Sequence, residues 1–258
     1  MKKLATLASL ALLGICSAAS AAEVWTQVSG SGKLTWSGFE SGSVGVNVQK
    51  NNGGQITYNG SGGQFSGRFY SDGSSNPDEF FRFFCIDLSQ YAAAGPLDYR
   101  ASELNSVPLA RLFDIAYPNE SLGDFYDGGG KTTFGLFDSG IKSAAFQLAV
   151  WELFYDTSSS NSLGGGNFKS NIDAKESGTS AEQAVWQAND WLAQLKDGAG
   201  SAAGWTLYQF TSPTNQDYLS AIYRQPTTAT AGSVPEPGTL AMLGLGFAAL
   251  AAIRRRKR

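Results

Sequence analysis

The sequence predicts an α+β domain, a β-rich sandwich or barrel-like fold with a helical insert. Short β-prone runs separated by Asn- and Gly-rich turns fill its first part and return near its end, and helical runs lie between them. Glycine accounts for 31 of the 258 residues and charged residues for only 16%, a balance typical of β-rich extracellular proteins. An aromatic content of 12% argues against global disorder.

The predicted strands are short, except for one continuous apolar run. Turn-forming Asn and Gly clusters at 51–54 and 59–63 separate the early strands. The run at 80–88 is nearly unbroken in apolar residues, which predicts a strand buried on both faces. The expected strands lie at residues 33–36, 43–48, 55–58, 64–70, 80–88, 205–210 and 218–222.

Three helices are expected in the middle of the chain. The first spans residues 110–117 and is stopped by Pro118. The second spans residues 141–155 and is apolar around most of its circumference, which predicts a buried helix. The third spans residues 180–196, and its first residues, a serine followed three positions later by a glutamine, predict a capping box.

The N-terminus predicts a signal peptide over residues 1–22. A basic start precedes an apolar run at 4–15, and a small-residue cleavage site ends at Ala21, so cleavage is expected after Ala21 or Ala22. A lipoprotein cut before Cys16 is the alternative, but an isoleucine stands where that signal needs a small residue. The secreted domain is then expected over residues 23–226.

The C-terminus predicts a membrane-anchored sorting segment. A polar linker at 227–233 leads into residues 234–258. An uncharged apolar stretch at 238–253 predicts a short transmembrane helix, and the basic block at 254–258 marks its cytoplasmic side. The proline-flanked motif that opens the segment consists of Pro235, Glu236 and Pro237.

This combination of motif, short span and terminal arginine cluster resembles the PEP-CTERM sorting signal. The resemblance covers about the last 25 residues. It implies a Gram-negative bacterium and an exosortase-type enzyme that cuts near the motif. The precursor would sit in the inner membrane, and the processed protein would reach the cell surface or the extracellular matrix.

Charge and composition exclude several function classes. The two ends hold seven of the 19 basic residues and one of the 22 acidic residues, which leaves 12 basic and 21 acidic residues, a net charge of −9, for the secreted part. Such a surface repels phosphate, so nucleic acid is not an expected partner. The chain contains no histidine, which excludes Ser-His-Asp and Cys-His catalysis and His-ligated metal sites.

Two residues in the secreted part stand out chemically. Cys85 is its single cysteine, and Gln147 is the one amide in an otherwise apolar helical turn. Cys85 has a simple alternative role as a buried apolar thiol. A buried amide without partners is costly, so Gln147 needs either a structural hydrogen bond to a strand backbone or a chemical role.

The flanks of these two residues resemble a known family. An aromatic-Cys-Ile-Asp sequence at 84–87 is followed by Ala-x-Gln-x-Ala-Val-Trp-Glu at 145–152. Together they are similar to the thioester domain of bacterial surface adhesins, whose best understood members come from Gram-positive cell walls. The resemblance spans roughly residues 55–222, and these two motifs are its specific part. It implies that the side chains of Cys85 and Gln147 join as an internal thioester.

The chemistry that this implies is acyl transfer. The Cys85 thiolate would attack the Gln147 amide carbon and expel ammonia, and an amine such as a target lysine would later take the acyl group. The aromatic residues Phe83 and Phe146 are expected to help exclude water. The expected supporting residues are Phe84, Trp151, Asp87 and Glu152. The two acids would orient groups or act as a base, with surface solvation or capping as the alternative.

Other candidate sites are weaker. Asp124, Asp127 and Asp138 lie in Gly-rich loops, but their spacing fits no calcium loop, and the glycine run at 127–131 lacks the spacing of a phosphate loop. No metal or cofactor and no enzymatic activity are therefore expected. Two functions stay open: covalent attachment to a surface target, with protein lysine or polysaccharide as candidate partners, and a noncovalent role in an extracellular matrix.

Overall fold

The structure is a computed structural model. It describes residues 29–51, 53–71, 79–93, 95–117, 126–127, 130–131, 137–156 and 161–223. The expected signal peptide, the linker and the sorting segment, with its motif and its span at 238–253, lie outside these residues. Within the described part of the chain, no helix is long and apolar enough to cross a membrane.

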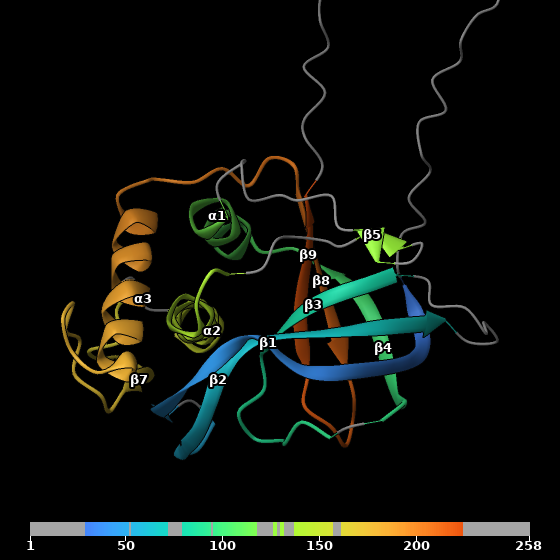
Figure 1. Ribbon diagram of the computed structural model, residues 1–258, viewed down its shortest axis with the longest axis horizontal. Helices are drawn as coiled ribbons and strands as arrows, with labels where there is room; N and C mark the ends of the chain where they lie inside the picture. The colour runs from blue at the N-terminus through green and yellow to red at the C-terminus, as the bar shows by residue number, and fades with distance from the viewer. Residues whose placement is uncertain are drawn as a thin grey trace, which may run out of the picture.

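Six antiparallel strands close into a barrel, which confirms the barrel-like prediction (Figure 1). Neighbouring strands follow the order β2-β3-β9-β8-β4-β1, and β1 pairs with β2 to complete the circle. The six strands are β1 (Gly30–Lys50), β2 (Ile56–Ser71), β3 (Glu79–Cys85), β4 (Leu97–Leu104), β8 (Trp205–Thr211) and β9 (Tyr218–Tyr223). The short strand β7 (Phe168–Ser170) adds to the far end of β1, and β5 (Tyr126–Asp127) pairs with β6 (Gly130–Lys131).

The barrel is filled with aromatic side chains. Phe83 of β3 packs against Phe210 of β8 and Tyr218 of β9, with ring centroids 5.1 and 5.7 Å apart. Phe69 of β2 reaches the same Phe210 ring at 5.4 Å. Since residues alternate between the two faces of a strand, Phe83 and Cys85 of β3 both face the barrel interior, and Phe84 between them faces outward.

The strand boundaries differ from the predicted ones in the first hairpin. The predicted strands at 33–36 and 43–48 are parts of one long strand, β1, which bends through register shifts between Trp36 and Ser43. The predicted turn at 59–63 is also wrong, because these residues continue β2 and pair with β1. Strand β4 was not predicted, although its alternating burial is typical of a strand with one buried face.

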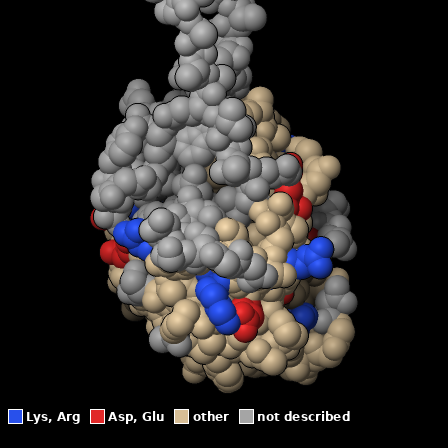
Figure 2. Space-filling view, turned by 90° about the vertical axis from the view of Figure 1, so that its right-hand side faces the viewer, with Lys and Arg blue, Asp and Glu red and all other residues tan. Residues whose placement is uncertain are grey.

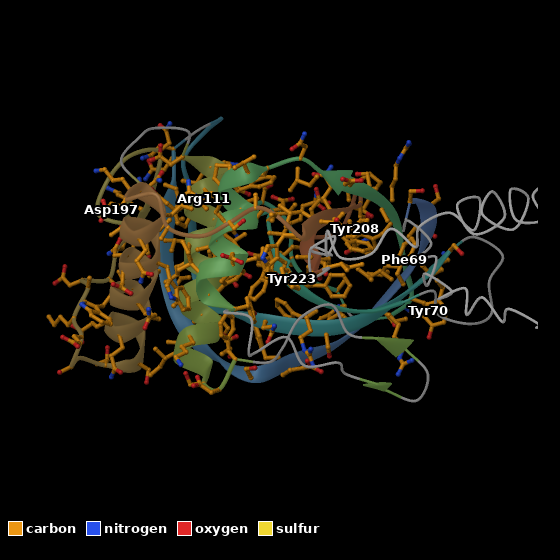
Figure 3. All side chains as sticks on the ribbon, turned by 90° about the horizontal axis from the view of Figure 1, so that it is seen from above. Phe69, Tyr70, Arg111, Asp197, Tyr208 and Tyr223 are labelled. Atoms are coloured by element: carbon orange, nitrogen blue, oxygen red, sulfur yellow. The ribbon has the colours of Figure 1, made fainter. Side chains whose placement is uncertain are left out.

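Helices α1 (Val107–Ala116), α2 (Gly140–Tyr155) and α3 (Ser180–Lys196) pack together beside the barrel (Figure 1). The prediction that the second helix is buried is confirmed, because α2 lies between the barrel and the other two helices. In Figure 3, Phe69 and Tyr208 lie on the barrel side and Arg111 and Asp197 on the helical side. The Arg111 guanidinium donates to the Leu195 carbonyl at 3.0 Å, which ties α1 to the end of α3.

The helix starts show where local signals were misread. α1 begins three residues earlier than predicted, because the Ser106 side chain caps it and Pro108 fits its first turn. The capping box of α3 is present one residue before the predicted position. Its members are Thr179 and Glu182, since Thr179 has the extended backbone that an N-cap requires.

Candidate functional site

The site lies where strands β2 and β3 separate. The two strands pair from Phe69 and Glu79 as far as Phe65 and Phe83. Beyond Phe65, β2 continues with β1, while β3 runs on to Cys85 beside β9. On the side where β2 has separated from β3, the backbone N–H and carbonyl of Cys85 therefore need partners from another element.

Helix α2 supplies these partners from one face. Four of its side chains recur at intervals of four residues, a spacing that places them in a row along the helix. All four are buried or nearly so. We call this row the α2 stripe; it consists of Ser143, Gln147, Trp151 and Tyr155.

Gln147 occupies the position that a strand backbone would take beside Cys85. Its Oε1 accepts from the Cys85 backbone N–H at 2.8 Å, and its Nε2 donates to the Cys85 carbonyl oxygen at 2.7 Å. On the opposite side of β3, the Ile86 N–H donates to the Asp217 carbonyl at 2.9 Å. Adjacent residues of an antiparallel strand direct their backbone groups to opposite sides. The preceding residue, Cys85, therefore points its N–H and carbonyl away from β9 and toward Gln147.

Ser143 and Tyr155 of the α2 stripe extend this hydrogen bonding in both directions, whereas the Trp151 Nε1 has no hydrogen-bond partner in the described part of the chain. The Ser143 Oγ accepts from the Gln64 N–H of β2 at 2.7 Å. The Tyr155 Oη donates to the Ile86 carbonyl at 2.6 Å and accepts from the Leu88 N–H at 2.9 Å. Sequence reasoning missed Ser143 and Tyr155, although polar atoms at a four-residue spacing in an apolar helix were a usable signal.

Two glycines of β2 make room for the helix. A Cβ on Gly62 would lie 3.5 Å from the Gln147 Cγ, and one on Gly63 would lie 3.1 Å from the Ser143 Oγ and 2.9 Å from the Gly42 carbonyl oxygen. The second position is therefore too tight for a side chain. The glycine run predicted to turn the chain instead lets α2 approach the strand closely.

The Cys85 thiol is held in its neutral form. The side chain is free and buried, with 4% exposure. Burial raises the pKa of the thiol, and the negative charge of Asp87 raises it further. The expected thiolate is therefore not the resting form. Burial is the main cause that raises the pKa of four nearby tyrosines. The negative charge of an ionised Cys85 would raise these pKa values further. The four residues are Tyr58, Tyr99, Tyr155 and Tyr218.

Phe84 and Trp151, two of the predicted supporting residues, each pack against another aromatic ring. Phe84 faces the helices and packs against Phe146 of α2, with ring centroids 4.5 Å apart and the ring planes tilted by 49°. Trp151 meets the Tyr58 ring of β2 edge-on at 5.6 Å. The Gln147 side chain itself is buried, with 1% exposure.

Asp87 has a structural role in the chain turn after β3. Its carboxylate accepts from the Ser89 N–H at 2.7 Å, and its backbone carbonyl accepts from the Gln216 Nε2 at 2.7 Å. Because its charge raises the pKa of the Cys85 thiol, it opposes the ionisation that a base would assist. Asp87 fits the capping alternative better than the role of a base.

Glu152 is buried and serves a neighbouring loop. Its Oε1 accepts from the Ser162 N–H at 2.8 Å, and its Oε2 has no hydrogen-bond partner. Burial raises the pKa of Glu152 to about 8 against the effect of the Ser162 bond, and the charge of Asp156 adds to the rise. Its hydrogen bond therefore goes to this loop, and none joins it to Cys85 or Gln147 among the described residues.

Comparison with protein families identifies the C-terminus. Residues 233–257 match the PEP-CTERM protein-sorting motif. The predicted sorting signal is confirmed. The motif implies export of the chain, a membrane-anchored precursor and processing by an exosortase-type system. No curated protein matches the chain.

Two solved structures are similar to part of this chain. The N-terminal domain of the Streptococcus pyogenes pilus tip adhesin Cpa is 16% identical, with a TM-score of 0.35, over 62% of this chain and 84% of that chain. The N-terminal thioester domain of a surface protein from Clostridium perfringens, in a cysteine-to-alanine variant, is 11% identical with the same TM-score of 0.35. It covers 62% of this chain and 88% of its own.

The remaining candidate sites find no support as metal centres. Asp138 pairs with Lys142 at 2.7 Å, and this contact lowers the pKa of its carboxyl. Asp124 and the side chain of Asp127 lie outside the described residues. Across the described part of the chain, no group of three metal-ligating side chains is present.

Basic and acidic side chains lie beside one another on the face in Figure 2.

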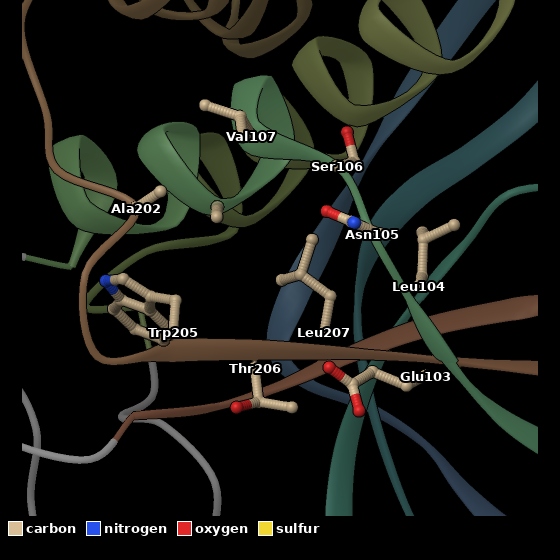
Figure 4. Close-up of a pocket in the computed structure, with 10 residues that line it drawn as sticks. Glu103, Leu104, Asn105, Ser106, Val107, Ala202, Trp205, Thr206 and Leu207 are labelled. Carbon is tan, nitrogen blue, oxygen red and sulfur yellow. The ribbon is translucent and has the colours of Figure 1, made fainter.

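A separate cavity of about 160 Å³ lies where β4 runs into α1 (Figure 4). Glu103 and Asn105 line one side, and Trp205 and Leu207 of β8 line the other. No member of the α2 stripe lines it, so it is distinct from the Cys85–Gln147 site.

Proposed function

We propose that this exported protein acts at the cell surface or in the extracellular matrix of a Gram-negative bacterium, where it attaches covalently to amine-bearing targets through a Cys85–Gln147 thioester. The observation that carries the proposal is the double hydrogen bond between the Gln147 carboxamide and the Cys85 backbone. It supports a near-attack arrangement, because it holds the amide carbon of Gln147 beside the residue whose sulfur must reach it.

The first step forms the thioester. The Cys85 Sγ attacks the Gln147 Cδ, the C–N bond breaks, and the thiol proton leaves with the nitrogen as ammonia. Negative charge develops on the Gln147 Oε1, which the Cys85 N–H approaches to 2.8 Å. That N–H therefore stabilises the tetrahedral intermediate as an oxyanion donor. A neutral thiol suits this step, because it brings the proton that the leaving group needs.

The second step transfers the acyl group to a target. A target amine attacks the Gln147 Cδ, the C–S bond breaks, and the sulfur takes a proton from the amine. The products are an amide bond to the target and a free Cys85 thiol. Each molecule reacts once and is not regenerated, so we propose an attachment device and not an enzyme.

A noncovalent matrix protein is the second candidate function, and one observation favours it. The same two hydrogen bonds give both backbone groups of Cys85 a partner without any reaction. Gln147 would then be a structural residue that closes the split between β2 and β3.

Intact-mass measurement of the mature protein, together with thiol titration after denaturation, separates the two functions. The covalent proposal expects a mass lower by one ammonia and no titratable thiol. Methylamine should then add to the protein and free one thiol. The matched control is Cys85→Ala, which should keep its full mass and take up no amine. A full mass and a free thiol in the mature wild-type protein would support the noncovalent function instead.

A further inference from the structure

The hydrogen bonds of Cys85 change when ammonia leaves. Before the reaction, the Gln147 Nε2 donates to the Cys85 carbonyl oxygen at 2.7 Å, and the Oε1 accepts from the Cys85 N–H at 2.8 Å. Thioester formation keeps the oxygen and removes the nitrogen with its hydrogens. The buried Cys85 carbonyl oxygen is then left without that donor, immediately beside the acyl carbon.

We propose that this carbonyl oxygen is the specificity-determining group that restricts acyl transfer to primary amines, an inference that rests on the proposed thioester. By microscopic reversibility, an attacking amine nitrogen occupies the place from which the ammonia nitrogen left. That place lies within hydrogen-bond distance of the Cys85 carbonyl oxygen. An attacking N–H can therefore donate to this oxygen while the nitrogen lone pair bonds to the Gln147 Cδ.

The proton balance of the step distinguishes primary from secondary amines. A primary amine carries two hydrogens: one donates to the Cys85 carbonyl oxygen, and the other passes to the sulfur as the C–S bond breaks. A secondary amine carries one hydrogen and must give it to the sulfur. Its collapse to product therefore leaves the carbonyl oxygen unpaired, with a second alkyl group turned toward it.

An alcohol meets the same obstacle as a secondary amine, because it also has a single transferable hydrogen. Water has two and satisfies the requirement, so protection against hydrolysis falls to the rings that cover the site. Two ring pairs are the candidates for this role: Phe84 with Phe146, and Tyr58 with Trp151.

Three small amines test the proposal on mature protein whose mass has first shown the loss of ammonia. Ethylamine and dimethylamine are isomers of closely matched basicity that differ in their number of N–H groups. Isopropylamine is bulkier near its nitrogen but keeps two N–H groups, so it controls for shape. Rates of thiol release and of adduct formation are divided by the rate of each amine with a small alkyl thioester in the same buffer.

We expect dimethylamine to react at least about tenfold more slowly than ethylamine after this correction, since a buried acceptor loses its hydrogen bond. Isopropylamine should stay within about threefold of ethylamine, because it keeps the N–H that the acceptor needs. A smaller penalty for dimethylamine, or an equal penalty for isopropylamine, overturns the inference while the thioester itself stands. A full-mass protein that takes up no amine overturns the proposed function instead.

Discussion

The carboxamide of Gln147 binds both backbone groups of Cys85, with its oxygen 2.8 Å from the Cys85 nitrogen and its nitrogen 2.7 Å from the Cys85 carbonyl oxygen. The two residues lie 62 positions apart in the chain. A single side chain thereby substitutes for a missing strand, because a primary amide carries the same donor and acceptor as a peptide group. The fold and the proposed thioester chemistry therefore depend on the same pair of residues.

Replacing Gln147 should therefore destabilise the fold in which its amide is still intact. Gln147→Ala leaves the Cys85 N–H and carbonyl buried without partners, and we expect the free energy of unfolding to fall by about 2–4 kcal/mol. Denaturant unfolding measures the change. Gln194→Ala on the exposed face of α3 is the control and should stay within about 0.5 kcal/mol of wild type. A loss below about 1 kcal/mol for Gln147→Ala would show that the amide is not needed there.

The Tyr155 hydroxyl makes a second, independent test of the α2 stripe. Tyr155→Phe keeps the ring and removes the group that binds the Ile86 carbonyl and the Leu88 N–H. We expect a loss of about 1–3 kcal/mol in the free energy of unfolding, because two buried backbone groups lose their partner.

Tyr91→Phe provides the matched control for this change, since Tyr91 is 85% exposed. Its unfolding free energy should match that of wild type within error. Equal stability of the two variants would mean that the segment after β3 does not depend on the helix.

Much of the fold follows from local patterns in the sequence. Residues 141–155 are apolar around most of the circumference, which predicted a buried helix, and α2 packs against the barrel and two helices. The continuous apolar run at 80–88 predicted burial on both faces; Phe83 faces the barrel and Phe84 the helices. The strand ends at Cys85, three residues earlier than predicted, because partners from α2 and the chain before β9 replace the ladder there.

The features that local patterns miss depend on distant contacts. The glycines at 60–63 match a turn by composition, and only the approach of α2 explains why they continue a strand. The Cys85–Gln147 site was located through a motif resemblance, whereas its hydrogen bonds could not be derived from either motif alone. Local sequence also does not give burial, which raises the pKa of the Cys85 thiol and favours its neutral form at rest.

Glu152 should make stability depend on pH. Burial raises its pKa from 4.5 to about 8, so between these values the folded state binds more protons than the unfolded state. The stabilisation is complete below pH 4.5 and is lost as pH rises toward about 8. Glu152→Gln does not titrate, so its unfolding free energy should fall less than that of wild type over this range. Parallel pH profiles for the two proteins would contradict the raised pKa.

The sorting motif predicts a defined intermediate when its cleavage site is changed. We expect the uncharged stretch of 16 residues at 238–253 and the following basic block to hold the precursor in the inner membrane, with the basic side in the cytoplasm. We expect cleavage near Pro235 to separate the secreted domain from this anchor. Replacing Pro235, Glu236 and Pro237 by alanine should therefore leave a full-length, membrane-bound form, which cell fractionation and immunoblotting would detect. Alanine substitutions at Thr227 and Thr228, in the linker before the motif, are the control and should be processed normally. Normal processing of the motif variant would mean that another determinant directs cleavage.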